Sequence, residues 1–471
     1  MVAEQRVTGA DHGAEIPATA TPVPGRFVVF GIVSLALLMA SVDQTIVATA
    51  LPALQHDLHA QVNWSSWTIT IYALGQILVM PVAGKIGDQY GRKRIFLGAA
   101  VLFTTASLCC GFANDIYLLI VLRGCQAIGG GAFMPSATGI VAQIFGRDRD
   151  RAVGLFSSIF PIGGIIGPIL GGVFVTYWSW RGIFLVNVPI GVALVALGAV
   201  FIPVSARAGG QRLDVRGVLL LGVTLLSAMF GIAYLGGGAS SPAAPAFLVP
   251  EAVAVVGLIL FVRHSARAPS PFISIRFLAG RGFGVMNLLN FLFGAAALGF
   301  GALIPLYAQD RYGLATLAAG TLLSARAVGM IATAGLAVLL LRRTGYRWPM
   351  AVGFTLTAAG LVATASSPAG LPPYTWLALA AGVCGIGMGI STPASNNATL
   401  QLAPDQAAAV AGLRGMFRQS GSITAVAITA AIAARSADPG IAQAHVFLVF
   451  AGILLCALPL ILLVPEHRGR W

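Results

Sequence analysis

One acidic residue lies well inside a long apolar run near the start of the chain. Asp43 falls within the run 27–51, and no other carboxylate of the sequence lies so deep in such a run. A charged carboxylate at the centre of a membrane helix costs about 2.5–3.5 kcal/mol on insertion scales, so such acids are functional candidates. Because a carboxylate binds and releases protons, Asp43 suggests proton coupling. The alternative is a structural acid that is permanently paired with an arginine.

Arg123 is the candidate partner of Asp43. At 1.5 Å per residue, Asp43 lies about 24 Å from the start of its run. Arg123 lies about 9 Å from the start of the fourth apolar run, 117–141, which crosses the membrane in the opposite direction. These depths are similar in a hydrocarbon core about 30 Å thick. We therefore expect the two to pair, with Gln126, one helical turn from Arg123, completing the network.

Further polar residues in later apolar runs predict a substrate cavity. Arg326 lies about 15 Å into its run, too deep to reach water easily. Asn287, Asn290 and Phe291 share a helical face with Gly294, which would suit an amphipathic ligand. The candidate cavity residues are Gln126, Asn287, Asn290, Phe291, Arg326 and Arg418.

Each of these cavity residues has a plainer interpretation. The two amides also suit interhelical packing, and Arg414 and Arg418 also suit snorkelling towards the membrane surface. His445 favours packing over proton transfer. If the arginines line the cavity, the charge favours neutral or anionic amphiphiles over dications.

The elements that must position these residues are membrane helices. Of the 471 residues 57% are hydrophobic and only 9% are charged, against about 25% charged in soluble proteins, which excludes soluble, collagen-like and disordered chains. Fourteen apolar runs are long enough to cross a bilayer. They cover 27–51, 65–83, 95–113, 117–141, 153–176, 183–203, 217–236, 247–263, 284–308, 316–341, 349–366, 375–396, 409–433 and 443–465.

The runs predict an all-α membrane protein with two six-helix bundles and two linker helices. A weak repeat supports this division, because the loop Gly87–Arg94 and the loop Leu341–Trp348 each follow the second run of a set of six. The predicted parts are a disordered cytoplasmic tail 1–26, a bundle 27–204, a linker with cytoplasmic loops 205–282, a bundle 283–465 and a cytoplasmic tail 466–471.

The distribution of Lys and Arg orients the chain. Most of them fall in alternate loops, whereas the opposite loops hold only Arg181, Arg311 and Arg435. Under the positive-inside rule both termini are cytoplasmic, and the predicted location is the inner (cytoplasmic) membrane of a bacterium. Topology also explains the net charge of +13, so we expect no nucleic-acid partner. The five cysteines lie in apolar runs and suggest neither disulfides nor metal binding.

Two glycine-rich strings stand out. The segment GKIGDQYGRKR, from Gly84 to Arg94, joins the second and third runs, and its Asp88 can pair with a cation or a helix N-terminus. The fifth run carries small residues at a spacing that permits close helix contact, with a proline that removes a backbone hydrogen bond. This string consists of Gly154, Gly163, Gly167, Pro168, Gly171 and Gly172.

The first string resembles the signature loop of the major facilitator superfamily, and the second resembles that superfamily's antiporter motif. With VDQTIVATALP, RGCQAIG and WRGIFLVNVPIG, the chain is similar to the fourteen-helix drug:proton antiporters, although Ala48 and Ala127 depart from the usual Asn and Gly. The resemblance implies a cytoplasmic gate formed by Gly84, Gly87, Asp88, Gly91 and Arg92. It implies antiport driven by protons, for which the buried Asp43 and its expected partner Arg123 are the candidate coupling residues.

The leading hypothesis is therefore a proton-coupled antiporter that exports drug-like or antibiotic-like amphipathic molecules. We expect no catalytic residues, no metal and no cofactor, with the proton gradient as energy source. We expect a monomer in the lipid bilayer, whose partner is a small-molecule substrate; a periplasmic adaptor is unknown. The alternatives are a dedicated exporter of an endogenous metabolite or lipid, a non-transporting membrane sensor or scaffold, and a membrane enzyme. The enzyme is disfavoured because no G-x-S-x-G elbow or paired histidines at metal spacing occur.

Overall fold

The computed structural model describes most of the chain. The described residues are 25–60, 62–204, 214–235, 241–269, 271–280, 282–366, 368 and 370–466. The predicted tails 1–26 and 466–471 lie almost wholly outside this range, as does the predicted loop with Arg207 and Arg212.

Every regular element in the described residues is helical, because a backbone in lipid must satisfy its own hydrogen bonds. We refer to α1–α8 as the first half. Its helices are α1 (Arg26–Asp57), α2 (Val62–Tyr90), α3 (Arg92–Gly111), α4 (Ile116–Phe145), α5 (Arg149–Ser157), α6 (Ile159–Tyr177), α7 (Gly182–Leu185) and α8 (Asn187–Phe201).

Two helices and a short segment follow, and then the second half, α12–α18. The connecting helices are α9 (Val215–Leu235), α10 (Pro245–Arg267) and α11 (Ile275–Ala279). The second half comprises α12 (Phe283–Phe293), α13 (Gly299–Tyr312), α14 (Thr316–Thr344), α15 (Arg347–Ala365), α16 (Pro373–Gln401), α17 (Ala407–Ala433) and α18 (Pro439–Cys456).

The number of membrane-spanning helices is close to the expected fourteen. Within the described residues, 13 stretches are long and apolar enough to cross a membrane. Helix α17, the remaining expected span, has 27 residues, but Arg414, Arg418 and Gln419 interrupt its apolar sequence. The all-helical fold is confirmed.

Three of the expected spans are interrupted. The fifth divides at Ser158 into α5 and α6, and the sixth divides at Val186 into α7 and α8. The ninth contains a π-helical segment, Gly294–Leu298, between α12 and α13. Pro168 lies inside α6 without ending it. Such interruptions in membrane helices often mark functional positions.

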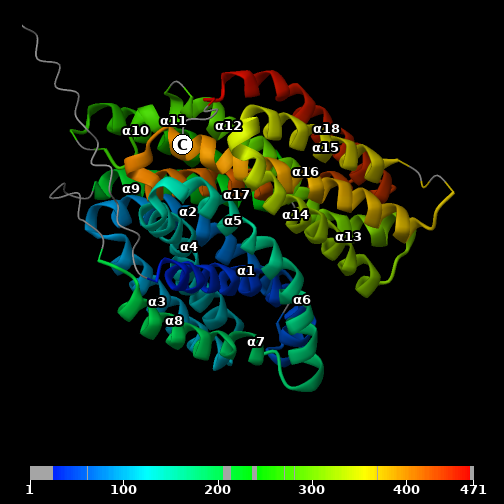
Figure 1. Cartoon of the computed structure of the whole chain (residues 1–471). Helices are drawn as coiled ribbons and strands as arrows, with labels where there is room; N and C mark the ends of the chain where they lie inside the picture. Colours follow the sequence, from blue (N-terminus) through cyan, green and yellow to red (C-terminus); the bar gives the residue numbers. More distant parts are fainter. Residues whose placement is uncertain are drawn as a thin grey trace, which may run out of the picture.

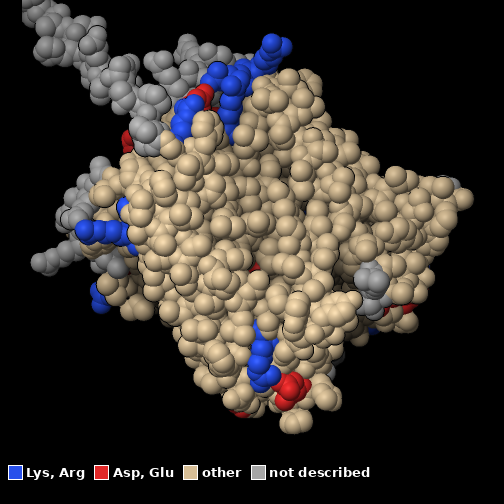
Figure 2. Space-filling model, turned by 60° about the horizontal axis from the view of Figure 1, so that its bottom comes forward, with Lys and Arg blue, Asp and Glu red and all other residues tan. Residues whose placement is uncertain are grey.

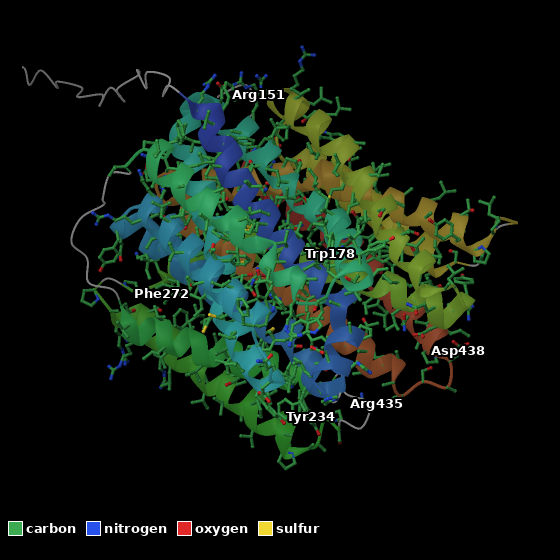
Figure 3. The ribbon with its side chains drawn as sticks, turned by 90° about the horizontal axis from the view of Figure 1, so that it is seen from below. Arg151, Trp178, Tyr234, Phe272, Arg435 and Asp438 are labelled. Atoms are coloured by element: carbon green, nitrogen blue, oxygen red, sulfur yellow. The ribbon has the colours of Figure 1, made fainter. Side chains whose placement is uncertain are left out.

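The halves meet at one end of the molecule and diverge towards the other. Helices α2 and α17 lie side by side, whereas the far ends of α6 and α13 point away from each other (Figure 1). We call the end where the halves meet the basic end, since it carries the α2–α3, α4–α5 and α14–α15 connections. Arg151, at this end, lies far from Asp438 (Figure 3).

The outer surface is largely uncharged. Lys, Arg, Asp and Glu gather at the margins of the visible face, with a broad uncharged band between them (Figure 2). Exposed side chains such as Val200, Leu258 and Leu339 contribute to the apolar surface of the molecule. This arrangement suits a molecule surrounded by lipid.

The pair α9 and α10 is closed at the basic end by Asp214. Its carboxylate accepts hydrogen bonds from the Gly217 and Phe272 amides at 2.9 and 3.0 Å and contacts His264 Nε2 at 2.8 Å. Burial alone would raise the pKa of Asp214, but these hydrogen bonds outweigh it and hold the pKa below its usual value.

Candidate functional site

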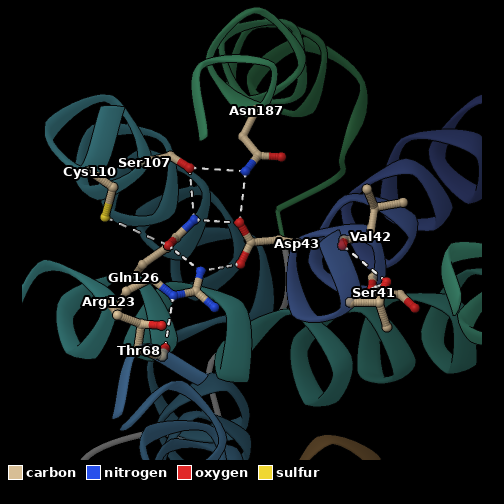
Figure 4. A network of polar contacts seen from close by, with 10 residues as sticks. Ser41, Val42, Asp43, Thr68, Ser107, Cys110, Arg123, Gln126 and Asn187 are labelled. Atoms are coloured by element: carbon tan, nitrogen blue, oxygen red, sulfur yellow. Dashed lines mark hydrogen bonds and ion pairs between the residues drawn. The ribbon is translucent and has the colours of Figure 1, made fainter. Parts of the chain in front are cut away.

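Asp43 and its expected partner Arg123 meet in the interior of the first half (Figure 4). Arg123 Nη1 on α4 lies 2.6 Å from Asp43 Oδ2 on α1. The other carboxylate oxygen accepts hydrogen bonds from Gln126 Nε2 at 2.8 Å and Asn187 Nδ2 at 2.9 Å. Because Asp43 is 0% exposed and Arg123 1% exposed, the pair is shielded from water.

Arg123 is also held by groups other than Asp43. Its Nε donates to the Thr68 carbonyl at 3.2 Å, and its Nη1 donates to Gln126 Oε1 at 2.7 Å. The Tyr72 ring lies 4.1 Å from its guanidinium carbon, within cation–π distance. The guanidinium would therefore keep partners if the carboxylate left it.

Asn187 is a member of this network that the sequence analysis missed. It begins α8, directly after the break at Val186. Ser107 Oγ on α3 accepts from both Asn187 Nδ2 at 3.0 Å and Gln126 Nε2 at 2.7 Å. The available signal was an amide within the apolar run 183–203. The break aims this amide inwards.

The hydrogen bonds of the network suit the ionised form of Asp43. In its ionised form the carboxylate is paired and receives two amide hydrogen bonds, which offsets part of the cost of burying the charge. Protonation of Asp43 would remove its attraction for Arg123 and leave a buried cation without a counterion. Since one uncompensated buried charge costs about 3–5 kcal/mol, protonation favours a different packing of α1 against α4.

The glycine stripe of α6 packs against the same helix, α1. A Cβ added to a stripe glycine would meet side chains close to Asp43. The encounters are Gly163 with Ser41 Oγ, Gly167 with Thr45 Oγ1 and Gly171 with Thr49 Oγ1. Helices α1 and α6 therefore contact each other tightly around the ion pair.

The remaining residues of the second glycine-rich string have other surroundings. Gly172 faces open space, so it is not part of the contact with α1. Gly154 lies on α5, where an added Cβ would come 3.5 Å from Pro393 Cβ in the second half. The string therefore serves two contacts, one within the first half and one between the halves.

The signature loop locks the halves together at the basic end. Asp88 Oδ2 accepts from the backbone amide of Ala409, near the N-terminus of α17, at 3.0 Å. Its Oδ1 pairs with Arg92 Nη2 at 2.8 Å, and Arg92 Nη1 donates to the Gly139 carbonyl at 2.7 Å. Gly84 lets α2 approach α17 closely, because a Cβ added at Gly84 would lie only 2.8 Å from Ala409 Cα.

The other two expected gate glycines have simpler surroundings. Gly91 separates α2 from α3 at φ 105°, a conformation that favours glycine. An added Cβ at Gly87 would make only ordinary contact with Arg92 Cγ at 3.9 Å.

A second contact between the halves forms around Asp150, which lies between the expected runs 117–141 and 153–176. Its Oδ2 accepts from Tyr346 Oη at 3.1 Å and Gln401 Nε2 at 3.2 Å in the second half. Its backbone carbonyl accepts from Asn397 Nδ2 at 2.9 Å. Asp150 lies in the first turn of α5, which is pressed against the other half, and a single sequence does not reveal this contact.

The expected cavity residues do not form one cluster around a single cavity. Gln126 belongs to the Asp43 network. Asn287 donates to the Phe277 and Leu278 carbonyls at 2.8 and 3.1 Å, and Asn290 donates to its own helix and accepts from Ser395. In this arrangement both amides make packing contacts, while the buried Asn287 Oδ1 has no hydrogen-bond partner.

Phe291 also lies at a packing contact, between α12 and α17. Its carbonyl would clash with a Cβ at Gly421. Arg326 and Arg418 lie deep in the second half on α14 and α17. Among the described residues no group of three or more His, Cys, Asp and Glu is placed to hold a metal.

A helical membrane protein with two such halves has the architecture of a secondary transporter. The chain belongs to the Major Facilitator Superfamily, whose model matches residues 33–426 and 286–471. This is a superfamily of transporters, not of enzymes.

Curated relatives include several resistance proteins. The chain is 30% identical to the methylenomycin A resistance protein of Streptomyces coelicolor over 92% of this chain and 90% of that protein. It is 31% identical to a multidrug resistance protein B homolog of Mycobacterium tuberculosis over 84% and 74%, respectively. It is 27% identical to the multidrug transporter protein MdtP of Bacillus subtilis, over 76% of this chain and 66% of that protein. It spans 53% of the length of another M. tuberculosis relative, an uncharacterized MFS-type transporter.

Solved structures share the fold at low sequence identity. The proton:xylose symporter XylE aligns with a TM-score of 0.69 at 13% identity, over 96% of this chain and 98% of XylE. The human organic anion transporter MFSD10 also aligns with a TM-score of 0.69, at 15% identity over 93% and 100%. These likenesses establish the fold.

The α1–α6 contact predicts a position-specific sensitivity to bulk. Gly167→Ala should destabilise the protein by about 1–3 kcal/mol through overpacking against Thr45 and the Val42 carbonyl. Gly167→Leu should insert into the membrane but lose transport. The measurement is unfolding of the purified protein, together with transport in vesicles.

Gly164→Ala is the matched control, because Gly164 lies in the same helix and an added Cβ would meet nothing within 4 Å. Equal stability of the alanine variants at Gly164 and Gly167, or wild-type transport by Gly167→Leu, would contradict the close contact.

The contact at Gly84 predicts control over the basic end. Gly84→Ala should push α2 from α17 and disfavour the closed arrangement by about 1–3 kcal/mol. Spin labels at Tyr90 and Asp405, in a background without the five native cysteines, should then report a larger population at long distance. Gly98→Ala, with nothing within 4 Å of its added Cβ, should leave the distance distribution unchanged. An unchanged distribution in Gly84→Ala would refute the role of this contact.

Proposed function

We propose that this chain is a proton-driven antiporter that exports drug-like or antibiotic-like amphipathic molecules across the cytoplasmic membrane. The observation that carries the proposal is the buried pair of Asp43 and Arg123, because Asp43 lies on α1, the helix that packs tightly against the glycine stripe of α6. An ion pair of this kind changes its charge with one proton, and α1 carries that change to its neighbours.

The names of the relatives support the proposed class of exported compound. Methylenomycin A resistance and multidrug resistance are the descriptions of relatives at 30% and 31% identity that span most of this chain. Resistance by a transporter is achieved when the toxic compound is moved out of the cell. The same direction of transport is proposed here.

The orientation follows from the positive-inside rule. We place the basic end in the cytoplasm, which puts both termini there too. The arrangement that is closed by Asp88 and Asp150 is then sealed towards the cytoplasm, while the halves diverge towards the outside. In this arrangement an exported molecule leaves and a proton enters.

Coupling arises because one proton alters the packing of α1. A proton arriving from outside neutralises Asp43, and Arg123 then keeps only its contacts with Thr68, Gln126 and Tyr72. The neutral acid loses its preference for the two amide donors. The halves then rock to the arrangement open to the cytoplasm, where the proton leaves and substrate binds.

The two other candidate functions differ from the proposed one in substrate range or in whether the protein transports at all. A dedicated exporter of an endogenous metabolite or lipid uses the same coupling with a narrower substrate range. A sensor or scaffold binds ligands without concentrating them. Transport of unrelated dyes against a gradient separates the proposed function from both.

Asp43→Asn tests the coupling, because it removes the titrating group and preserves its shape. In everted vesicles with an imposed pH gradient, we expect the wild-type protein to concentrate at least one of three dyes: ethidium, N-phenyl-1-naphthylamine or 8-anilinonaphthalene-1-sulfonate. Asp43→Asn should insert and bind dye, but lose pH-driven accumulation at least about tenfold, as expected when a coupling step costs more than about 1.4 kcal/mol. It should also show no substrate-induced proton release.

Asp310→Asn is the control, since this acid accepts a hydrogen bond from Gln443 at 2.8 Å and is not part of the ion pair. Its accumulation of dye should match that of the wild-type protein. Full accumulation by Asp43→Asn would eliminate Asp43 as the coupling residue. No accumulation of any dye by the wild-type protein would favour the metabolite exporter or the sensor.

A further inference from the structure

The second half contains three deep cations, Arg326, Arg414 and Arg418, that no described carboxylate neutralises. The described ion pairs do not include any of the three. In the first half, by contrast, Asp43 neutralises the deep cation Arg123. The second half therefore carries an excess of positive charge in its interior, with Arg414 buried and Arg326 and Arg418 partly exposed.

Arg326 has few partners of its own. Its Nη1 lies 3.7 Å from Met388 Sδ, a weak acceptor, and its Nε has no hydrogen-bond partner although it is buried. The guanidinium rests against Gly301 on α13, where an added Cβ would lie 2.6 Å from the guanidinium carbon. Arg326 lies about 15 Å along α14, near the middle of the expected membrane span.

Arg418 is similar in depth and in its lack of partners. It lies about 17 Å along α17, which enters from the basic end. Its buried Nε has no hydrogen-bond partner, and its guanidinium carbon lies 5.6 Å from the centre of the Phe293 ring.

Arg414 differs because its guanidinium has a polar partner. Its Nη1 donates to Asn396 Oδ1, and the Asn396 amide in turn donates to Ser157 Oγ in the first half. We therefore assign Arg414 to the contact between the halves, which leaves Arg326 and Arg418 as the pair of under-satisfied cations.

The π-helical segment links the surroundings of these two arginines. Phe293, whose ring faces the guanidinium of Arg418, immediately precedes the segment Gly294–Leu298. Gly301, which contacts the guanidinium of Arg326, follows the segment shortly afterwards. At Gly294 the backbone approaches that of Arg418 so closely that a Cβ would clash. Widened helical turns of this kind often occur at functional sites.

From these contacts we infer that Arg326 and Arg418 bind the negatively charged group of an exported amphipathic anion, such as a carboxylate or a sulfonate. The inference rests on the proposed function and names its substrate class. Burying a charge without a partner is costly, and guanidinium groups bind carboxylate-like anions through paired hydrogen bonds. The free Nε of each arginine is available for that purpose, while Phe293 offers an aromatic surface to the apolar part.

A small inorganic anion offers the same charge without the apolar part. If chloride were the natural occupant, it would satisfy the arginines but make no use of the ring at Phe293. The test therefore compares an amphipathic anion with a neutral molecule of the same skeleton and with chloride.

The probes are 8-anilinonaphthalene-1-sulfonate and N-phenyl-1-naphthylamine, which has the same rings without the sulfonate. Their binding to the purified full chain is measured by equilibrium dialysis in detergent, with binding to protein-free micelles subtracted. We expect Arg326→Gln and Arg418→Gln each to weaken binding of the sulfonate at least about tenfold and to change binding of the neutral probe less than about twofold, as expected for loss of a charge-assisted hydrogen bond. Arg418→Lys should recover part of the sulfonate binding, because it restores the charge.

Arg263→Gln is the matched control, because it removes an arginine from the exposed part of α10. It should leave the binding of both probes unchanged. Unchanged sulfonate binding in both variants, or equal loss of both probes, would overturn the inference. So would competition of chloride with the sulfonate at equimolar concentration, because chloride lacks the apolar part.

Dialysis uses no proton gradient, so its result is independent of coupling. Loss of pH-driven transport in Asp43→Asn together with unaltered sulfonate binding in the arginine variants would leave the proposed antiport in place and remove only the anion site. The reverse pair of results would remove the antiport and retain the site.

Discussion

The ion pair of Asp43 and Arg123 is the interaction on which the rest of the first half depends. Its charges can be held in an apolar interior only because α3, α4 and α8 supply donors and acceptors around them. Removing one partner would leave the other charge uncompensated at about 3–5 kcal/mol. The break between α7 and α8 follows the same constraint, since it brings Asn187 to the carboxylate.

Helix α1 links two neighbours of the first half, because it contacts α4 on one face and α6 on another. Its Asp43 side chain pairs with α4, and the residues around Asp43 receive the glycine stripe of α6. Small residues let the two backbones approach, so α1 has little room to shift relative to α6. A change in the ion pair is therefore passed on to α6, whose preceding helix α5 contacts the second half at Gly154 and Asp150.

The sequence was sufficient to locate the helices and the ion pair. Apolar length and alternating Lys and Arg locate the membrane spans, and depth arithmetic brings Asp43 level with Arg123, because helices crossing one bilayer share one coordinate. The sequence did not predict features that depend on how a helix is rotated about its axis or on where a helix is interrupted. Asn187 points inwards because of a break at Val186, and Gly172 points away from α1, neither of which hydropathy encodes. Asp150 is charged and near a turn, which is also the pattern of an exposed loop residue.

The unequal charge of the two halves bears on the energy source. Each elementary charge that crosses the membrane is worth about 2.3 kcal/mol per 100 mV. When a proton enters and an organic anion leaves, both movements carry positive charge inwards, so an inside-negative potential drives both. When a proton enters and a dication leaves, the potential opposes the net movement. Under the proposed proton antiport and anion site, a second half with cations that lack carboxylate partners would select the substrates for which the membrane potential adds to the proton gradient.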